Sequence, residues 1–296
     1  MGTSAKTLSR FVSLHMRGLL KNGASIIELG AQELYCTGME DYVRGVIRYF
    51  SGNNAAIKVA DQYSKAELTR FADKGLLGKL MIACGFAYRA LDIFEAENTT
   101  LFDLNIQTPG KDLIEQFDLV TNFGTTEHVI NQYQSLKTMH ELARPGGLIH
   151  HELPLAGYHN HGYFSYNPLL FIQLAEANGY KIILQNYSKA GTPTAAPEFM
   201  TENGFPESNY YDYGIEFIFQ KVSLAPFRMP LETSTSLGLS KTMWGDANPY
   251  WDKDFRPEGA PSPFASSALH DASGWALQRE LLRRYRRKLA SLLKLN

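Results

Sequence analysis

The sequence has few cysteines and no long apolar run. Its two cysteines, Cys36 and Cys84, are too few for a disulfide framework, so we expect reduced thiols in the core and a reducing, cytoplasmic setting. No window approaches the roughly 18 apolar residues of a membrane-spanning helix. Basic residues also interrupt the apolar stretches of the first 22 residues, which disfavours a secretory signal.

An excess of charge of one sign is also missing. The 296 residues include 29 Lys+Arg and 30 Asp+Glu, with a formal net charge of −1, and 44% are hydrophobic. This balance excludes a disordered chain, a collagen-like fibre and a polycationic protein that coats nucleic acid. We therefore expect a soluble globular protein, with neither nucleic acid nor a membrane as partner.

Short apolar runs alternate with helical stretches between residues 25 and 223. A helix is predicted over Thr126–Ala143 from its apolar face, and another begins with Pro168 after an N-cap at Asn167 and ends before Gly179. Seven runs predict strands: Ser25–Leu29, Tyr88–Ile93, Leu101–Leu104, Phe117–Asn122, Gly147–Leu153, Tyr180–Gln185 and Ile215–Val222. This alternation predicts a doubly wound α/β fold with a seven-stranded, mostly parallel sheet.

The sheet domain is expected over residues 23–223, after an N-terminal helix in residues 1–22. Residues 35–66 exceed one crossover helix and suggest a lid-like insertion. Residues 188–214 form a long connection rich in Pro, Gly and Tyr, which could belong to a substrate wall.

Residues 224–296 lack the periodicity of the preceding domain. They are expected to form an extended arm, lying on the body or on a second subunit, and a basic helix over Trp275–Leu295. The basic helix has three interpretations: a helix docked by its leucines with a solvated basic face, a contact in a homo-oligomer, or a surface for an anionic partner.

Polar residues or glycine stand where four of the predicted strands end. Ligands of doubly wound sheets bind at the carboxyl ends of the strands. Gly30 would let the backbone approach a ligand, and Asp92 could accept both hydroxyl hydrogens of a ribose. Asp103 with Leu104 would suit an adenine edge. Residues 122–124 would lie beneath the reactive end of such a ligand.

Four segments together resemble the class I S-adenosylmethionine-dependent methyltransferases: Ile26–Gly30, Ala90–Ile93, Phe117–Val129 and Ala143–Gly147. Residues 161–168 are similar to a segment of methyltransferases from bacterial sugar and polysaccharide gene clusters. The resemblance implies a Rossmann-like transferase of small-molecule biosynthesis with S-adenosylmethionine as cofactor. The expected cofactor-binding residues are Glu28, Gly30, Ala31, Gln32, Asp92, Ile93, Asp103, Leu104, Asn122, Phe123, Gly124 and His128.

The first loop of this chain keeps one glycine, Gly30, where the family usually has two or three. Backbone N–H groups at a following helix start could still bind the methionine carboxylate. A dinucleotide-binding motif would need further glycines at Gln32 and Tyr35, so a nicotinamide enzyme is disfavoured, and no Walker phosphate loop is present.

Four histidines lie close together in sequence: His150, His151, His159 and His161. Alternation along a strand sends the first two to opposite faces, and we expect one to pack inside and the other to reach the cleft. Methyl transfer to a hydroxyl requires in-line placement and removal of a proton, which a neutral imidazole accepts near pH 7. The candidate catalytic residues are His161 first, then His159 and His151.

Other roles for these side chains remain open. Any of the histidines could be a structural hydrogen-bonding group. His151, Glu152, His159 and His161 include metal-ligating types, but their spacing matches no standard site, and we predict no metal. Glu127 and His128 stand at an expected helix start, where they would either cap the helix or lie near the cofactor.

The sequence thus predicts methylation of a small polar metabolite, at a hydroxyl oxygen and with a histidine base. One alternative is N-methylation of an amine, for which the base is dispensable. Another is a non-catalytic methyltransferase-like subunit that binds a partner through the arm and basic helix. A homo-oligomer would form through the same arm and helix.

Overall fold

The computed structural model describes residues 2–51, 62–158, 161–194 and 210–230. The chain divides into two compact units, Met1–Lys253 and Asp254–Asn296. The second unit lies entirely outside the described residues. The expected basic helix and all of the arm beyond residue 230 are therefore predictions without a structural counterpart here.

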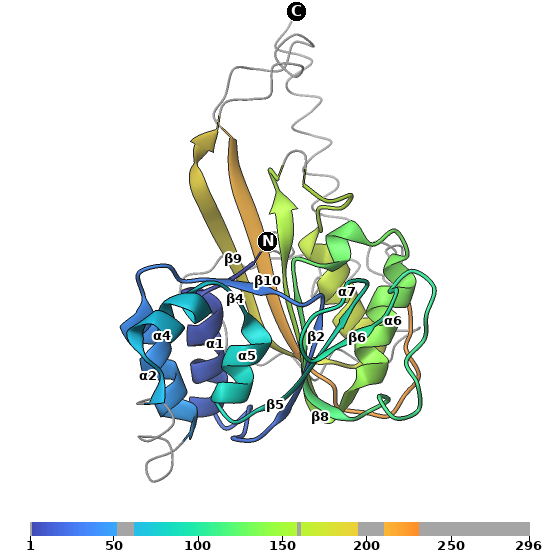
Figure 1. Ribbon diagram of the computed structural model, residues 1–296. Coiled ribbons are helices and arrows are strands. Elements are labelled where there is room, and N and C mark those ends of the chain that lie inside the picture. Colours follow the sequence, from blue (N-terminus) through green and yellow to red (C-terminus); the bar gives the residue numbers. More distant parts are fainter. Residues whose placement is uncertain (1, 52–61, 159–160, 195–209, 231–296) are drawn as a thin grey trace, which may run out of the picture. The chain divides into compact units, whose positions relative to one another are not determined.

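A seven-stranded sheet forms the centre of the first unit, as predicted (Figure 1). Strands β6, β5, β2, β7 and β8 are mutually parallel, β10 runs antiparallel to β8, and β9 runs antiparallel to β10. The order across the sheet is β6 (Thr99–Leu101), β5 (Ala87–Asp92), β2 (Ser25–Leu29), β7 (Phe117–Phe123), β8 (Ala143–Ala156), β10 (Tyr210–Gln220) and β9 (Lys181–Thr194).

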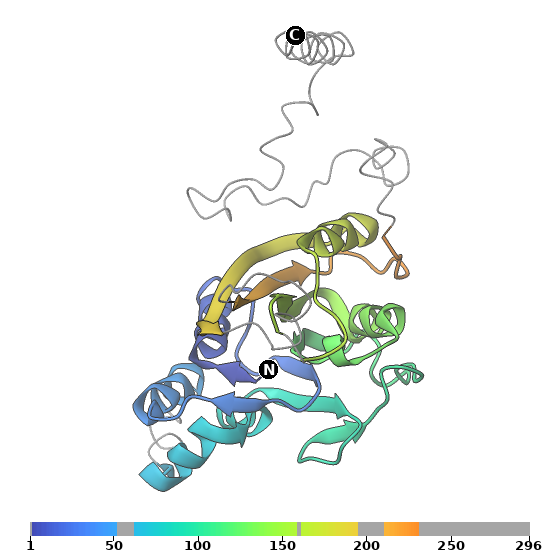
Figure 2. The same ribbon diagram turned by 90° about the horizontal axis from the view of Figure 1, so that it is seen from above.

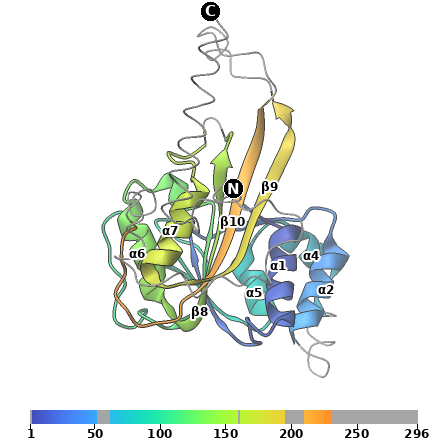
Figure 3. The same ribbon diagram turned by 180° about the vertical axis from the view of Figure 1, so that it is seen from behind.

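Helices cover both faces of the sheet (Figures 1 and 3). One face carries α1 (Ala5–Met16), α2 (Glu40–Ser51), α4 (Lys65–Ala72) and α5 (Leu77–Ala83), and the other carries α6 (Gln132–Leu142) and α7 (Pro168–Asn178). Seen from above, the strands lie between these two groups (Figure 2). No helix in the described ranges is long and apolar enough to cross a membrane.

Successive residues of the central strands feed two separate cores. In β2, Ile26 packs with the face covered by α1 and α2, and Ile27 packs with the face covered by α6 and α7. In β7, Leu119 and Val120 divide in the same way. This alternation follows from the two-residue period of a strand, and it explains why buried parallel strands read as continuous apolar runs.

The predicted connection over residues 188–214 differs in the structure. Its two ends belong to the ladder between β9 and β10, which pairs Lys189 with Tyr213 and Thr194 with Tyr210. Strand pairing uses backbone hydrogen bonds and does not depend on the side chains. Because Gly and Ser interrupt the apolar pattern in these strands, the sequence did not indicate the pairing. Residues 195–209 lie outside the described ranges.

A small three-stranded sheet was not predicted from the sequence. It pairs β1 (Thr3–Ser4) with β3 (Glu33–Tyr35), and β3 with β4 (Asp73–Leu76). It therefore joins the chain start to the segment that follows the first strand of the main sheet. Within the expected lid region of residues 35–66, α2 buries one apolar face in the same core as α1.

Ion pairs hold α1 to the sheet. The buried carboxylate of Glu216 on β10 accepts from Arg10 Nε at 2.7 Å and lies 3.1 Å from His150 Nε2. Burial alone would raise the pKa of Glu216, but hydrogen bonds from His150 and Arg10 hold it far below its usual range. Lys6 also pairs with Glu152 on β8, at 3.3 Å. The first helix is thus tied to the seven-stranded sheet.

Candidate active site

A cavity of about 320 Å³ opens where β2, β5 and β7 end. This is the edge at which doubly wound sheets bind ligands. Eight of the predicted cofactor residues line it: Gly30, Gln32, Asp92, Ile93, Asp103, Leu104, Gly124 and His128. Six residues that the sequence analysis did not single out complete the lining: Leu91, Phe94, Phe102, Asn105, Thr125 and Val129. All six are direct sequence neighbours of predicted residues, and that adjacency was the available signal.

Gly30 turns the chain at the floor of the cavity. Its φ is +72°, and an added Cβ would lie 2.5 Å from the Thr125 hydroxyl oxygen. That hydroxyl accepts from Gln32 Nε2 at 3.0 Å and donates to the carbonyl of Leu29 at 2.5 Å. Only glycine fits here without displacing Thr125, because the conformation and the space both exclude a side chain.

Asp92 is held with its carboxylate at the cavity wall. One oxygen accepts from the backbone N–H of Ala31 at 2.8 Å, and the other from Phe94 at 3.1 Å. A carboxylate has about four lone-pair sites. Lone pairs on both oxygens therefore remain for further hydrogen-bond donors, and the N–H groups of Ala31 and Phe94 orient this carboxylate.

Three predicted cofactor residues are buried beneath the cavity and do not line it: Glu28, Asn122 and Phe123. Glu28 accepts a hydrogen bond from Tyr88, and burial raises the pKa of Glu28 to about 8. The amide of Asn122 bonds Thr126, and Phe123 packs edge-on against Phe11.

His150 and His151 point to opposite faces of β8, as alternation requires. Both are nonetheless buried, so the expectation that one reaches the cleft is wrong. His151 lies 3.2 Å from the amide of Asn122 and packs on Phe171, and burial lowers its pKa to about 3. The cause is the position of β8 between β7 and β10, where the His150 ring packs edge-on against Phe123 and the His151 ring packs against Phe171 and Phe219. His159 lies outside the described residues.

A short 3₁₀ turn over Thr126–His128 precedes α6, which starts at Gln132 and not at Thr126 as predicted. The Asn122 side chain bonds both the N–H and the hydroxyl of Thr126, and the Tyr166 hydroxyl lies 2.9 Å from the same hydroxyl. Asn131 caps α6 in place of Glu127. The turn is therefore held by these side chains and by Gln132, the first residue of α6, whose amide donates to the Thr126 carbonyl at 2.7 Å.

Glu127 points its side chain from this turn into the protein. The residue is fully buried, and neither carboxylate oxygen has a hydrogen-bond partner among the described residues. Burial raises its pKa to about 7. A buried, unpartnered carboxylate is costly, so its retention points to a ligand or a proton that it serves.

The loop after β8 brings His161 against Glu127. The Glu127 carbonyl accepts from Tyr163 N–H at 2.7 Å and from Phe164 N–H at 3.2 Å. Gly162, with φ +70°, leaves room for Glu127, because an added Cβ would lie 2.9 Å from its Cγ atom. Nε2 of His161 consequently lies 3.7 Å from Oε1 of Glu127.

His128 connects this pair to the cavity. Its ring lies edge-on to that of His161, with centroids 4.9 Å apart, and the same residue lines the cavity of about 320 Å³. Burial lowers the pKa of both imidazoles below the usual value. Both are thus neutral near pH 7 and carry a lone pair that can accept a proton or bind a cation.

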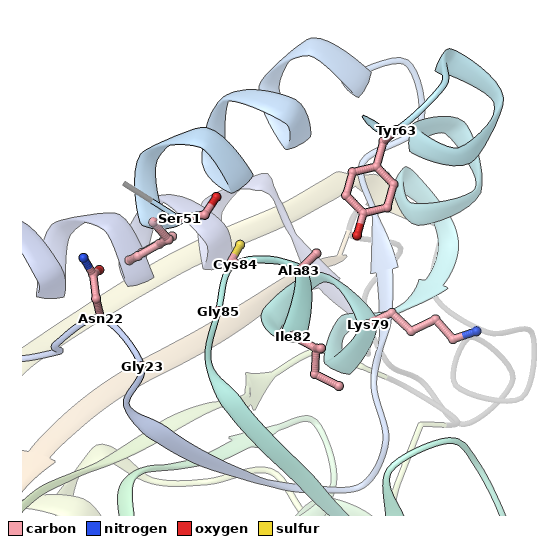
Figure 4. Close-up of a pocket in the computed structure, with 10 residues that line it drawn as sticks. Asn22, Gly23, Ser51, Tyr63, Lys79, Ile82, Ala83, Cys84 and Gly85 are labelled. Carbon is pink, nitrogen blue, oxygen red and sulfur yellow. The ribbon is translucent and has the colours of Figure 1, made fainter. Parts of the chain in front are cut away.

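A second cavity of about 550 Å³ lies near the amino ends of β2 and β5 (Figure 4). Asn22, Gly23, Tyr63 and Cys84 are among its lining residues. Burial raises the pKa of the Cys84 thiol to about 12, which removes it as a nucleophile near neutral pH. The cavity is at the edge of the sheet opposite to the usual ligand edge, and we assign it no chemistry.

Residues 72–183 match the family model described as "Methyltransferase domain". This match covers less than half of the chain. No curated protein matches the chain. The match and the strand order agree with the predicted class, an S-adenosylmethionine-dependent methyltransferase, and with the predicted cofactor.

Solved structures give fold-level similarities. A candidate methyltransferase from Bacillus halodurans has 12% identity and a TM-score of 0.41, covering 73% of this chain and 100% of that one. The 1,6-didemethyltoxoflavin-N1-methyltransferase of Burkholderia thailandensis has 12% identity and a TM-score of 0.38, covering 74% and 78%. The Haemonchus contortus phosphoethanolamine N-methyltransferase 2 has 11% identity and a TM-score of 0.37, covering 73% and 53%.

Proposed function

We propose that the chain transfers the methyl group of S-adenosylmethionine to a hydroxyl oxygen of a small polar acceptor, with His161 as the proton acceptor. The observation that carries the proposal is the contact between His161 and the buried Glu127. The ring of His161 also packs against that of His128, which lines the cavity.

The cavity residues suit the cofactor at three points. Asp92 has lone pairs left for the ribose hydroxyl groups, and Leu104 with Asp103 offers an apolar wall and an acceptor for an adenine edge. The bare backbone at Gly30 permits close approach of the ligand. Gly124 and His128 lie on the β7 side, where we place the sulfonium end.

The reaction then needs little covalent help from the protein. The acceptor oxygen attacks the methyl carbon, the carbon–sulfur bond breaks, and S-adenosylhomocysteine leaves as a neutral thioether. The hydroxyl proton passes to the imidazole of His161. The carboxylate of Glu127, once ionised, stabilises the imidazolium that forms, because opposite charges at this distance in a buried site attract strongly.

Calorimetric titration with S-adenosylmethionine and S-adenosylhomocysteine tests the cofactor. We expect saturable binding of both, with thermal stabilisation that follows the affinity. The absence of heat and of thermal shift at millimolar ligand would contradict the proposal and favour a non-catalytic subunit.

Matched acceptors test the atom that is methylated. Pairs of small polar compounds that differ only in a hydroxyl or an amine are incubated with labelled cofactor, and the products are identified by mass spectrometry. We expect methyl ethers as products. N-methylated products alone, at a rate unaffected by His161→Ala, would contradict the oxygen acceptor and the histidine base.

A further inference from the structure

Glu127, His128 and His161 form a cluster of potential metal ligands. One donor atom of each residue can be chosen so that all lie within 4.8 Å of one another. The three residues come from the 3₁₀ turn before α6 and from the loop after β8, and the backbone bonds between Glu127 and residues 163–164 hold these two segments together. The cluster is thus built by the tertiary structure.

The donor distances are close to those of a coordinated cation. Nitrogen and oxygen ligands lie about 2.1 Å from zinc, so two ligands of a tetrahedral site are about 3.4 Å apart. His161 Nε2 and Glu127 Oε1 are 3.7 Å apart. His128 is exposed and the His161 side chain is 33% exposed, so both can rotate to close the remaining gap.

The buried carboxylate is a second, independent observation. Both oxygens of Glu127 lack a hydrogen-bond partner among the described residues, and the side chain is fully buried. An unpartnered buried carboxylate is expensive unless a positive group meets it. The two imidazoles of the cluster bring no positive charge to Glu127 in their neutral form. Their lone pairs can instead bind the same cation as the carboxylate.

We propose that Glu127, His128 and His161 bind one divalent transition-metal ion, with zinc as the best match. Two imidazoles and one carboxylate are a donor set that zinc accepts in sites with an open position. Magnesium and calcium prefer oxygen ligands throughout, so they fit this set poorly.

The site differs from the metal set considered from the sequence. His151 is bonded to Asn122 inside the core, and Glu152 bonds Lys6 and Thr7 on α1. Neither reaches the cluster, whereas Glu127 and His128 enter it from a segment that the spacing of the histidines does not indicate. His161 alone belongs to both sets.

Metal binding needs no methyl transfer and goes beyond the proposed function. Metal binding does affect the proposed methyl transfer, since a cation on His161 occupies the lone pair that would take the proton from the substrate hydroxyl. We therefore expect Zn²⁺ to inhibit a turnover that depends on His161. Inhibition supports both proposals, and activation by Zn²⁺ would keep the metal site while overturning His161 as the base.

Cobalt absorption on the full chain, without cofactor, tests the site directly. The chelator-treated protein is titrated with Co²⁺, and Zn²⁺ is added to displace it. We expect one equivalent with visible d–d bands, and an affinity at least about tenfold weaker in Glu127→Gln and in His128→Ala. His15→Ala is the matched control, because His15 lies on α1 against Tyr49, away from the cluster.

Thermal unfolding of each variant without metal confirms that it is folded. If Glu127→Gln fails to fold, His128→Ala still tests the site, since His128 is exposed and its replacement should not disturb the core. Equal Co²⁺ affinity in wild type and in both folded cluster variants would overturn the proposal. So would a loss of binding in His15→Ala that matches the loss in His128→Ala.

Discussion

The Glu127 carboxylate and the His161 imidazole face each other at 3.7 Å from two different loops of the fold. The contact depends on Gly162, whose φ of +70° and missing side chain allow the loop to close over Glu127. Neither loop contains the whole site. A group that handles protons or binds cations therefore exists only once β7 and β8 lie side by side.

His161→Ala should leave cofactor affinity unchanged and lower turnover by about 10²- to 10⁴-fold, the usual contribution of positioned proton transfer. The acid limb of the pH–rate profile should disappear with it, because the group that must be deprotonated is gone. Steady-state kinetics with an acceptor found by the matched-compound experiment measures both effects. His15→Ala is the control, and turnover of His161→Ala equal to that of the control would show a structural role.

Gly30→Ala should abolish measurable cofactor binding or weaken it strongly. The new Cβ would lie 2.5 Å from the Thr125 hydroxyl at the floor of the cavity. Gly18→Ala provides a matched control, since Gly18 has a φ of +71° and no neighbouring atom within 4 Å of an added Cβ. Both variants carry the strain of a left-handed residue, about 1–2 kcal/mol. Only Gly30→Ala should lose affinity in calorimetry, and equal affinities would reduce Gly30 to a turn residue.

Asp92→Ala should weaken cofactor binding at least about tenfold, because hydrogen bonds to a charged group contribute about 1.5–3 kcal/mol each. The variant also removes the acceptor for Ala31 and Phe94, so its thermal unfolding must be followed in parallel. Asp112→Ala is the control, as the Asp112 side chain is 78% exposed and lies outside the cavity lining. Unchanged affinity in a folded Asp92→Ala protein would contradict the ribose assignment.

Glu28→Gln should make stability less dependent on pH. Burial raises the folded-state pKa of Glu28 to about 8, whereas the unfolded chain has a value near 4.5. Between these values the folded state binds more protons, so the free energy of unfolding falls as pH rises through this window. The neutral glutamine removes that slope, and urea denaturation at several pH values between about 5 and about 9 measures it.

Tyr88→Phe serves as the companion variant for Glu28. The Tyr88 hydroxyl donates to the Glu28 carboxylate and stabilises its charged form. Its removal should extend the fall in stability to higher pH, in the direction opposite to Glu28→Gln. Parallel stability curves for wild type and Glu28→Gln would mean that Glu28 is not titrating in the folded protein.

Local sequence signals determined several elements closely. The β-branched run of β2 has the predicted bounds Ser25–Leu29, and α7 begins after Asn167 and ends at Gly179, whose φ is +63°. Caps, a proline at the first helical position and strand periodicity act within a few residues, so they are legible in one sequence. The sequence also indicated the edge of the sheet at which the cavity opens, since parallel strands bring their carboxyl ends together.

The tertiary structure alone decided which side chains gather at this edge of the sheet. The sequence placed His151 among the candidate bases, but the packing of Phe171 and Phe219 against its ring buries it. It also placed Glu127 at a helix start, whereas the bonds of Asn122 and Tyr166 to Thr126 create a separate turn that directs the carboxylate inward. Contacts such as those of Tyr166 with Thr126 and of Phe171 with His151 join residues far apart in the chain, so periodicity within one segment does not reveal them. Periodicity could therefore locate the site's edge, and only packing could select Glu127, His128 and His161 within it.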